Sequence, residues 1–254
     1  EITALQGIMG RLYALNSGES VAVADAIEQH YWPRGAGDRL PDSAAAVVVG
    51  LADRLDSLVG LFAVGIRPTG AADPWGLRRA ALGVVHVLVG KELDLDLGEA
   101  LAPVAETLPV AVDADTLAEV LDYITKRYRG YLLDNGLPYD QVDAVLAARG
   151  SNPYLASRTL AELAPWVARD DWQGVLDSYA RCVRITRDLG ERLPLECGTL
   201  GEPAAEALFD AYAGAAGRVG PRSSVGQLLE VLAELKPAIE RFFAEVLVMA
   251  EDPV

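Results

Sequence analysis

The chain has 254 residues, of which 51% are hydrophobic and 23% charged, and its 37 acidic against 22 basic side chains give a formal net charge of -15. This length suffices for one large or two ordinary buried cores, and the charged fraction is too low for a disordered polymer. Two cysteines exclude a disulfide-rich framework and favour a reducing compartment, so we expect a cytoplasmic protein. No apolar run approaches the roughly 20 residues of a membrane span, so no membrane role is expected. The chain opens without Met in the middle of an apolar pattern, which is typical of a piece of a longer protein.

Helical signals recur through the first half of the chain. Ser17 precedes a helical run that continues through Ile27, and Asp42 precedes an Ala- and Val-rich run that ends near Phe62. The second run has the composition of a buried strand over its first residues, but its continued apolar spacing favours a core helix. Pro74 stands where a first helical turn tolerates it, ahead of a helix over residues 77–89.

The clearest amphipathic helix runs from Asp115 to Leu132, where apolar residues recur at the spacing of one helix face. Three basic residues, Lys126, Arg127 and Arg129, are expected off that face. Asn135-Gly136 ends this helix, and Pro138 opens a short one that ends at Gly150. Later helices are predicted at residues 154–167, 172–189, 203–216, 225–235 and 237–249.

No segment alternates with period two, so the sequence predicts an all-α fold. Glycines and prolines break any regular structure at residues 33–41 and 65–74, which are predicted to be loops. A domain boundary is expected between Leu108-Pro109 and Asp113, where two prolines and a short alternating patch at residues 93–97 separate two helical clusters.

The residues that usually perform catalysis are scarce. The chain has two histidines, His30 and His86, and contains neither a Cys-x-x-Cys pair nor a phosphate-binding Gly-x-x-x-x-Gly-Lys loop. His30, Asp53 and Asp56 form the one candidate metal cluster, and a histidine at a helix end beside two solvated acids is the better interpretation. We therefore expect no catalytic residue, no metal and no cofactor in this chain.

Arginines are the remaining candidates for a binding site. Arg78 and Arg79 begin a helix behind the loop at residues 65–74, where exposed backbone N–H groups also favour a phosphate. Arg181, Arg184 and Arg187 lie three residues apart, beside Tyr179, and form a strip along one helix. Guanidinium and aromatic groups together suit RNA phosphates and unstacked bases, although pairing with the abundant acids is the simpler expectation for the strip. Arg218 and Arg222 frame the turn at Gly220.

Short sequence blocks follow one another in a characteristic order and spacing. The N-terminal blocks lie at residues 5–10, 28–34, 51–58, 68–70, 73–74 and 77–83, and the stretch from Pro68-Thr69-Gly70 to Leu77-Arg78-Arg79 is highly specific. The C-terminal blocks lie at residues 139–140, 143–147, 181–185, 202–203, 242–243 and 246–252. Together these blocks resemble the beta subunit of bacterial glycyl-tRNA synthetase. The chain departs from the family pattern at Ala72, His86 and Arg184, where Lys, Arg and Asn are usual.

This resemblance implies a helical HD-type domain at residues 1–110, a helical linker at 111–172 and a truncated helical anticodon-binding domain at 173–254. It implies an enzyme of two alpha and two beta chains, in which the alpha subunit binds ATP and Mg and transfers glycine. The beta chain then holds glycine tRNA without catalysing the reaction, by its acceptor arm and its anticodon arm. The tRNA-binding residues implied are Arg78, Arg79, Arg181, Arg184 and Arg187.

Two alternatives stay open at this point. One is a residual HD-type metal phosphohydrolase, although the His-Asp ligand pair of such enzymes is absent. The other is a helical scaffold for assembly of the alpha and beta chains. The net charge of -15 opposes RNA binding, so the isolated chain is expected to bind tRNA weakly.

Overall fold

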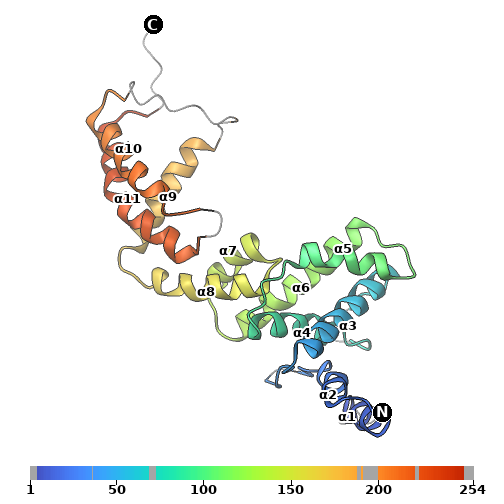
Figure 1. The fold of residues 1–254 in the computed structure, drawn as a ribbon. Coiled ribbons are helices and arrows are strands. Elements are labelled where there is room, and N and C mark those ends of the chain that lie inside the picture. Colours follow the sequence, from blue (N-terminus) through green and yellow to red (C-terminus); the bar gives the residue numbers. More distant parts are fainter. Residues whose placement is uncertain are drawn as a thin grey trace. The chain divides into compact units, whose positions relative to one another are not determined.

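The computed structural model describes residues 5–35, 37–68, 73–187, 190, 200–220 and 223–248. These residues form eleven α-helices and no strand, which confirms the expected all-α fold (Figure 1). Contacts divide the chain into two compact units, residues 1–160 and residues 161–254, with the division inside helix α8. Among the described residues, no helix is both long and apolar enough to cross a lipid bilayer.

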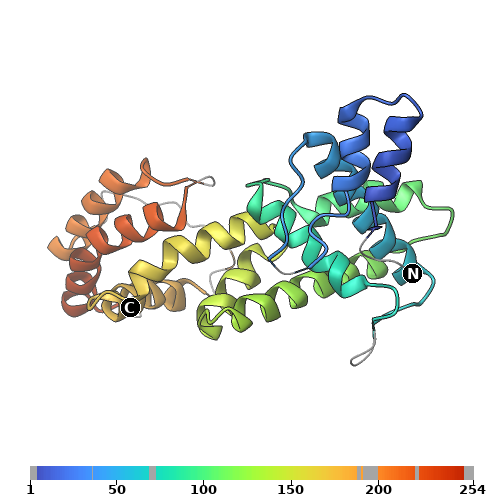
Figure 2. The ribbon, with the colours of Figure 1, turned by 90° about the horizontal axis from the view of Figure 1, so that it is seen from below.

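Unit 1 is a helical array built around α3, which packs against α2, α4, α5 and α6. The helices α1 and α2 form a hairpin, and α2 packs against α3 of the remaining unit (Figure 2). The core is apolar: Leu58, Val59, Val84, Leu88 and Ile124 are each fully buried. The helices of this unit are α1 (Ile8–Asn16), α2 (Val21–Gln29), α3 (Ala44–Ala63), α4 (Leu77–Gly90), α5 (Leu97–Thr107), α6 (Ala114–Asp134), α7 (Tyr139–Arg149) and the first part of α8 (Pro153–Val167).

Unit 2 contains α9 (Trp172–Thr186), α10 (Pro203–Ala216) and α11 (Val225–Glu245), together with the end of α8. α11 packs against both α9 and α10. Its N-terminus has a reciprocal cap, in which the Ser224 side chain accepts from the Gln227 backbone and the Gln227 side chain accepts from the Ser224 backbone. The backbone N–H of Gly226 also donates to Glu162 of α8 at 3.2 Å, which ties the start of α11 to that helix.

Helix boundaries match the sequence expectation where caps are strong and differ where burial overrides a local signal. α6 ends at Asp134, and Gly136 has the predicted left-handed conformation, with φ of 84°. The expected run from residue 17 to 27 is instead α2, capped by Ser20, and α1 precedes it. α5 was not predicted. Leu97 and Leu101 are buried in its first turns, ahead of Pro103.

The break predicted at residues 235–237 is wrong, because α11 continues through Pro237. Val231 and Ile239 are buried on either side of that proline, so both halves of the helix gain from packing. Such burial offsets a proline cost of about 3 kcal/mol. The described parts of the two predicted loops, at 33–41 and 65–74, contain no helix or strand, as expected.

The domain types expected at 1–110, 111–172 and 173–254 stay predictions. The helices α6 and α7 of the expected linker pack on one another within unit 1, and α6 also packs against α3, α4 and α5. Hydrogen bonds fix the turn before α8 in the same unit. Ser151 donates to Asp96 at 2.6 Å, and Asn152 donates to Asp94 at 2.7 Å.

Candidate nucleic-acid interface

The start of α4 is organised by Asp73. Its carboxylate accepts from the backbone N–H groups of Leu77 at 2.8 Å and Arg78 at 3.0 Å, while Gly76 before the helix has a left-handed φ of 70°. A carboxylate at a helix N-terminus satisfies the unpaired amides and favours the positive end of the helix dipole. The expectation that these amides are exposed to a phosphate is therefore wrong for Leu77 and Arg78. An anion at this turn would have to bind to side chains instead of these two amides.

The two arginines of this turn have different surroundings. Arg79 is exposed, and its guanidinium folds back over Gly76, so that a Cβ on Gly76 would lie 3.0 Å from Nη2. Arg78 is half-buried and reaches Tyr123 of α6. Burial of Tyr123 raises the pKa of its hydroxyl, and the charges of Arg127 and Arg78 act in the opposite direction.

Arg54 of α3 is buried, with 8% of its surface exposed, and it serves the backbone instead of an acid. Its guanidinium donates to carbonyl oxygens in the turn after α2 and in its own helix: His30 at 2.8 Å, Gly50 at 2.7 Å, Tyr31 and Trp32 at 3.0 Å and Pro33 at 3.4 Å. Burial lowers the pKa of Arg54, and the charge of Asp53 raises it in part. A cation here also complements the negative C-terminal end of α2.

Two glycines make room for this guanidinium. A Cβ on Gly83 of α4 would lie 2.5 Å from Arg54 Nε, and a Cβ on Gly50 would lie 2.7 Å from the His30 carbonyl oxygen. Side chains at either position therefore clash with Arg54 or with the turn that it binds. Gly83 and Arg54 both lie in sequence blocks that carry the family resemblance. The structure explains why these two residue types occur together, because the guanidinium occupies the space that a side chain at residue 83 would need.

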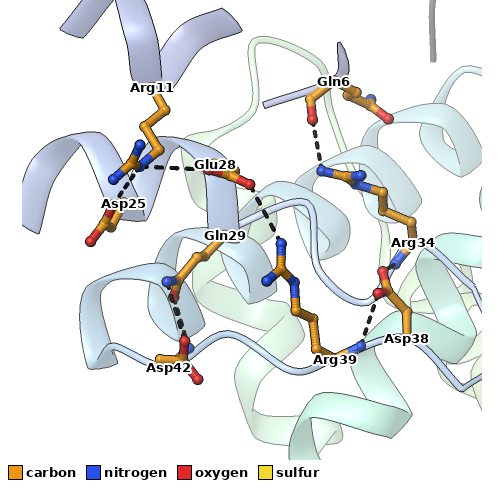
Figure 3. Close-up of polar contacts among 9 residues, drawn as sticks. All are labelled: Gln6, Arg11, Asp25, Glu28, Gln29, Arg34, Asp38, Arg39 and Asp42. Atoms are coloured by element: carbon orange, nitrogen blue, oxygen red, sulfur yellow. Dashed lines mark hydrogen bonds and ion pairs between the residues drawn. The ribbon is translucent and has the colours of Figure 1, made fainter. Parts of the chain in front are cut away.

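Polar contacts hold the α1–α2 hairpin to the loop at residues 33–42 (Figure 3). Glu28 lies between two arginines, with Arg11 and Arg39 each 3.6 Å away, and Arg11 also pairs with Asp25 at 2.6 Å. Arg39 lies 3.6 Å over the ring of Trp32, which is buried. The basic residues at this end of unit 1 are therefore occupied by acids, carbonyls or a ring.

The predicted strip on α9 is exposed at all three positions, Arg181, Arg184 and Arg187. Arg184 lies roughly opposite the buried Val175, because nine residues correspond to two and a half helical turns. Arg181 lies 5.5 Å from the ring centre of Phe243 on α11, and Arg184 donates to the Ala180 carbonyl at 3.1 Å. None of the three forms an ion pair with any acid that the structure describes, so the simpler expectation of a paired strip is not met there.

Other basic residues of unit 2 are paired. Arg218 contacts Glu234, with Nη2 to Oε1 at 2.9 Å, so it is occupied within the protein, and Arg222 lies outside the described residues. Arg169 pairs with Asp171 at 2.7 Å, and Arg241 pairs with Glu245 at 3.0 Å. The contrast singles out α9 as the helix of unit 2 whose arginines are available to an outside partner.

The candidate metal residues do not come together. Within the described ranges, no three His, Cys, Asp or Glu side chains are close enough to hold a metal ion. Asp53 and Asp56 are exposed, whereas His30 stacks against Tyr31 with ring centres 3.9 Å apart. His86 contacts the edge of Tyr131 at 4.8 Å, and burial lowers its pKa, which favours the neutral imidazole.

Comparison with known proteins decides the family. Residues 1–147 match the family model described as glycyl-tRNA synthetase beta subunit. This chain belongs to the glycyl-tRNA synthetase beta-subunit family. The match covers more than half of the chain, including all residues from the α1–α2 hairpin to α6, so the resemblance noted from the N-terminal motifs is confirmed.

Similar proteins in this family come from bacteria and a plant. The chain is 40% identical over 260 residues to a glycine–tRNA ligase beta subunit of Aromatoleum aromaticum, covering 100% of this chain and 37% of that protein. It is 38% identical over 258 residues to the Delftia acidovorans beta subunit, with 100% and 36% covered. It is 36% identical over 254 residues to a chloroplastic/mitochondrial glycine–tRNA ligase of Arabidopsis thaliana, with 99% and 24% covered. The chain thus spans between a quarter and two fifths of the length of these relatives.

In this beta-subunit chain, the predicted binding residues are divided between the two units. Arg78 and Arg79 lie in the first turn of α4 in unit 1, whereas in unit 2 Arg181 and Arg184 lie on α9 and Arg187 directly follows it. Their role in binding stays a prediction. Sequence reasoning missed Arg127 and Tyr123, which lie on α6 near Arg78. Their spacing of four residues on α6 was the signal that could have indicated a contact between them. Arg127 is half-buried instead of solvent-facing.

Proposed function

We propose that this chain is the part of a glycyl-tRNA synthetase beta chain that holds glycine tRNA, without catalysing aminoacylation itself. Residues 1–110, as an HD-type helical domain, contact the acceptor arm. Residues 173–254, as a helical anticodon-binding domain, contact the anticodon arm, and residues 111–172 link the two. The alpha chain is the partner that binds ATP and Mg, forms glycyl-adenylate and transfers glycine, and the complex works in the cytoplasm.

The observation that supports this function best is the arginine strip of α9. The chain has a net charge of -15, so acidic side chains outnumber the basic ones that they could pair with. Arg181, Arg184 and Arg187 are nevertheless exposed and unpaired with the acids that the structure describes. Arginines kept apart from carboxylates on one exposed helix suit a polyanion such as RNA, since guanidinium groups pair bidentately with phosphates and stack on bases.

A scaffold for the alpha chain is the second candidate function, and one observation favours it. Met9, Leu12 and Tyr13 of α1 are exposed, with Tyr13 exposed by 66%, and they share one side of that helix. Exposed apolar side chains grouped in this way are typical of protein contacts. The metal phosphohydrolase has no such support, because His30, Asp53 and Asp56 do not form a ligand group.

A gel-shift titration of the 254-residue chain tests the tRNA-holding function. The probes are glycine tRNA, its acceptor-arm minihelix and its anticodon-arm minihelix at about 50 mM salt, where phosphate contacts are strong. We expect whole tRNA to bind at least about tenfold more tightly than either minihelix, because two linked contacts act together. Folded chain that binds none of the three RNAs would contradict the proposal. Retention of the alpha chain without any tRNA binding would favour the scaffold.

A further inference from the structure

Polar side chains line the contact between α4 and α6, which pack side by side in unit 1 (Figure 1). Tyr123, Arg127 and Tyr131 are spaced four residues apart on α6, so they follow one another along one side of that helix. Arg78 reaches Tyr123 at one end of the row, and His86 contacts Tyr131 at the other, with ring centres 4.8 Å apart. Cationic and aromatic groups therefore alternate along this contact.

Arg127 is the unusual member of the row. Its guanidinium lies 5.5 Å from the ring centre of Tyr123, and its Nε is buried without a hydrogen-bond partner. It forms no ion pair within the described part of the chain. Arg129, two residues further along the same helix, has 43% of its side chain exposed and pairs with Asp143 through Nη2 at 3.0 Å. Asp143 is thus paired with Arg129 and not with Arg127.

The acids around Tyr123 already have partners. Asp73 accepts from two backbone amides at the start of α4. Glu119 pairs with Arg67, whose Nε lies 2.8 Å from Oε2, and Asp122 pairs with Lys126 at 2.7 Å. The charges of Arg78 and Arg127 both act on the Tyr123 hydroxyl, against the single negative charge of Asp73. The surroundings of this ring are therefore net positive.

Such an arrangement costs free energy in the absence of an anion. A half-buried guanidinium loses hydration without regaining every hydrogen bond, and a second guanidinium nearby repels it. A bound anion reverses both effects, because it accepts hydrogen bonds and neutralises the charges. The flanking tyrosine adds an aromatic surface for a sugar or base, which a small inorganic anion does not use.

We propose that Arg78 and Arg127 together bind a backbone phosphate of RNA, with the ring of Tyr123 supporting the adjoining nucleotide. Arg127 is thus a further tRNA-binding residue, on a helix where none was predicted. The inference rests on the proposed tRNA-holding function and identifies where unit 1 contacts the tRNA. The chemistry recognised is a phosphate group, and RNA is its source.

Fluorescence anisotropy with labelled glycine tRNA tests this site in the 254-residue chain. Arg127→Gln should weaken binding five- to tenfold and reduce the slope of log affinity against log salt by about one, as expected for one lost phosphate contact. Arg129→Gln removes the same charge from the same helix and should stay within twofold of wild type. Thermal unfolding followed by circular dichroism verifies that both variants are folded.

The outcomes separate this site from the general function. Wild-type binding with equal affinities for Arg127→Gln and Arg129→Gln would overturn the site and leave the tRNA-holding function standing, whereas no wild-type binding would overturn both. If Arg127→Gln does not fold, Arg127→Lys takes its place: a several-fold loss with an unchanged salt slope supports the site, and wild-type affinity refutes it. Binding of inorganic phosphate that is lost in Arg127→Gln, with the affinity for tRNA unchanged in that variant, would identify a free-anion site and contradict RNA as the source.

Discussion

At the scale of single residues, Arg54 has a structural role that its sequence context did not reveal. It lies between two exposed aspartates, Asp53 directly before it and Asp56 two residues after it. The guanidinium instead turns inward and donates to five backbone carbonyls. Every residue has a backbone carbonyl, so a sequence pattern does not indicate which carbonyls accept from Arg54. Only the fold of the turn after α2 identifies these partners.

Replacing Arg54 should therefore destabilise the protein strongly. Arg54→Met leaves buried carbonyls without donors, and we expect the free energy of unfolding to fall by about 3 kcal/mol or more. Arg54→Lys should lose less, because an ammonium group keeps the charge and three donors. Urea unfolding followed by circular dichroism measures both changes. Arg129→Met, at an exposed ion pair, is the control, and equal losses for Arg54→Met and Arg129→Met would show that the carbonyl contacts contribute little.

The residues of the candidate interface were predictable to different degrees. Arg181, Arg184 and Arg187 could be placed on one helix because helical spacing alone relates their positions. Their exposure and lack of acid partners depend on the packing of α9 against α11, which spacing does not encode. Arg127 was expected off the apolar face of α6. It is instead half-buried beside Tyr123, which Arg78 of α4 also reaches, and the sequence pattern does not encode this contact between two helices.

At the scale of elements, caps and glycines predicted helix ends better than prolines predicted helix breaks. The α6 helix begins after Asp113, which accepts from the Thr116 backbone N–H at 2.7 Å, and ends before Gly136. Pro103, Pro165 and Pro237 all lie inside helices. A proline costs one hydrogen bond and local strain. Around Pro237 the burial of Val231 and Ile239 offsets that cost, and burial depends on tertiary contacts.

Two helical glycines should respond oppositely to the same substitution. Gly83→Ala places a Cβ 2.5 Å from Arg54 Nε, so we expect a loss of about 1–3 kcal/mol in the free energy of unfolding. Gly130→Ala in α6 meets no atom within 4 Å and should gain about 0.5–1 kcal/mol from higher helix propensity. Urea unfolding measures both, and stabilisation by Gly83→Ala would show that Arg54 does not occupy this space.

At the scale of the whole molecule, the negative net charge opposes the proposed binding of tRNA. A net charge of -15 repels RNA at long range, so binding depends on local groups of arginines that act within a Debye length of about 10 Å at 0.1 M salt. Composition alone argued against a nucleic-acid partner. The paired arginines of the α1–α2 region and the unpaired arginines of α9 differ only in their neighbours, which the fold determines.

The most direct test of this account compares two triple variants in a salt titration with glycine tRNA. One variant changes Arg181, Arg184 and Arg187 to Gln, and the other changes the ion-paired Arg169, Arg218 and Arg241 to Gln. Both lose three charges from unit 2, so long-range repulsion is matched. We predict a loss of at least about tenfold and a salt slope reduced by two to three for the α9 variant, with the control within about twofold of wild type. Equal losses in both variants, or no loss in either, would contradict the α9 interface.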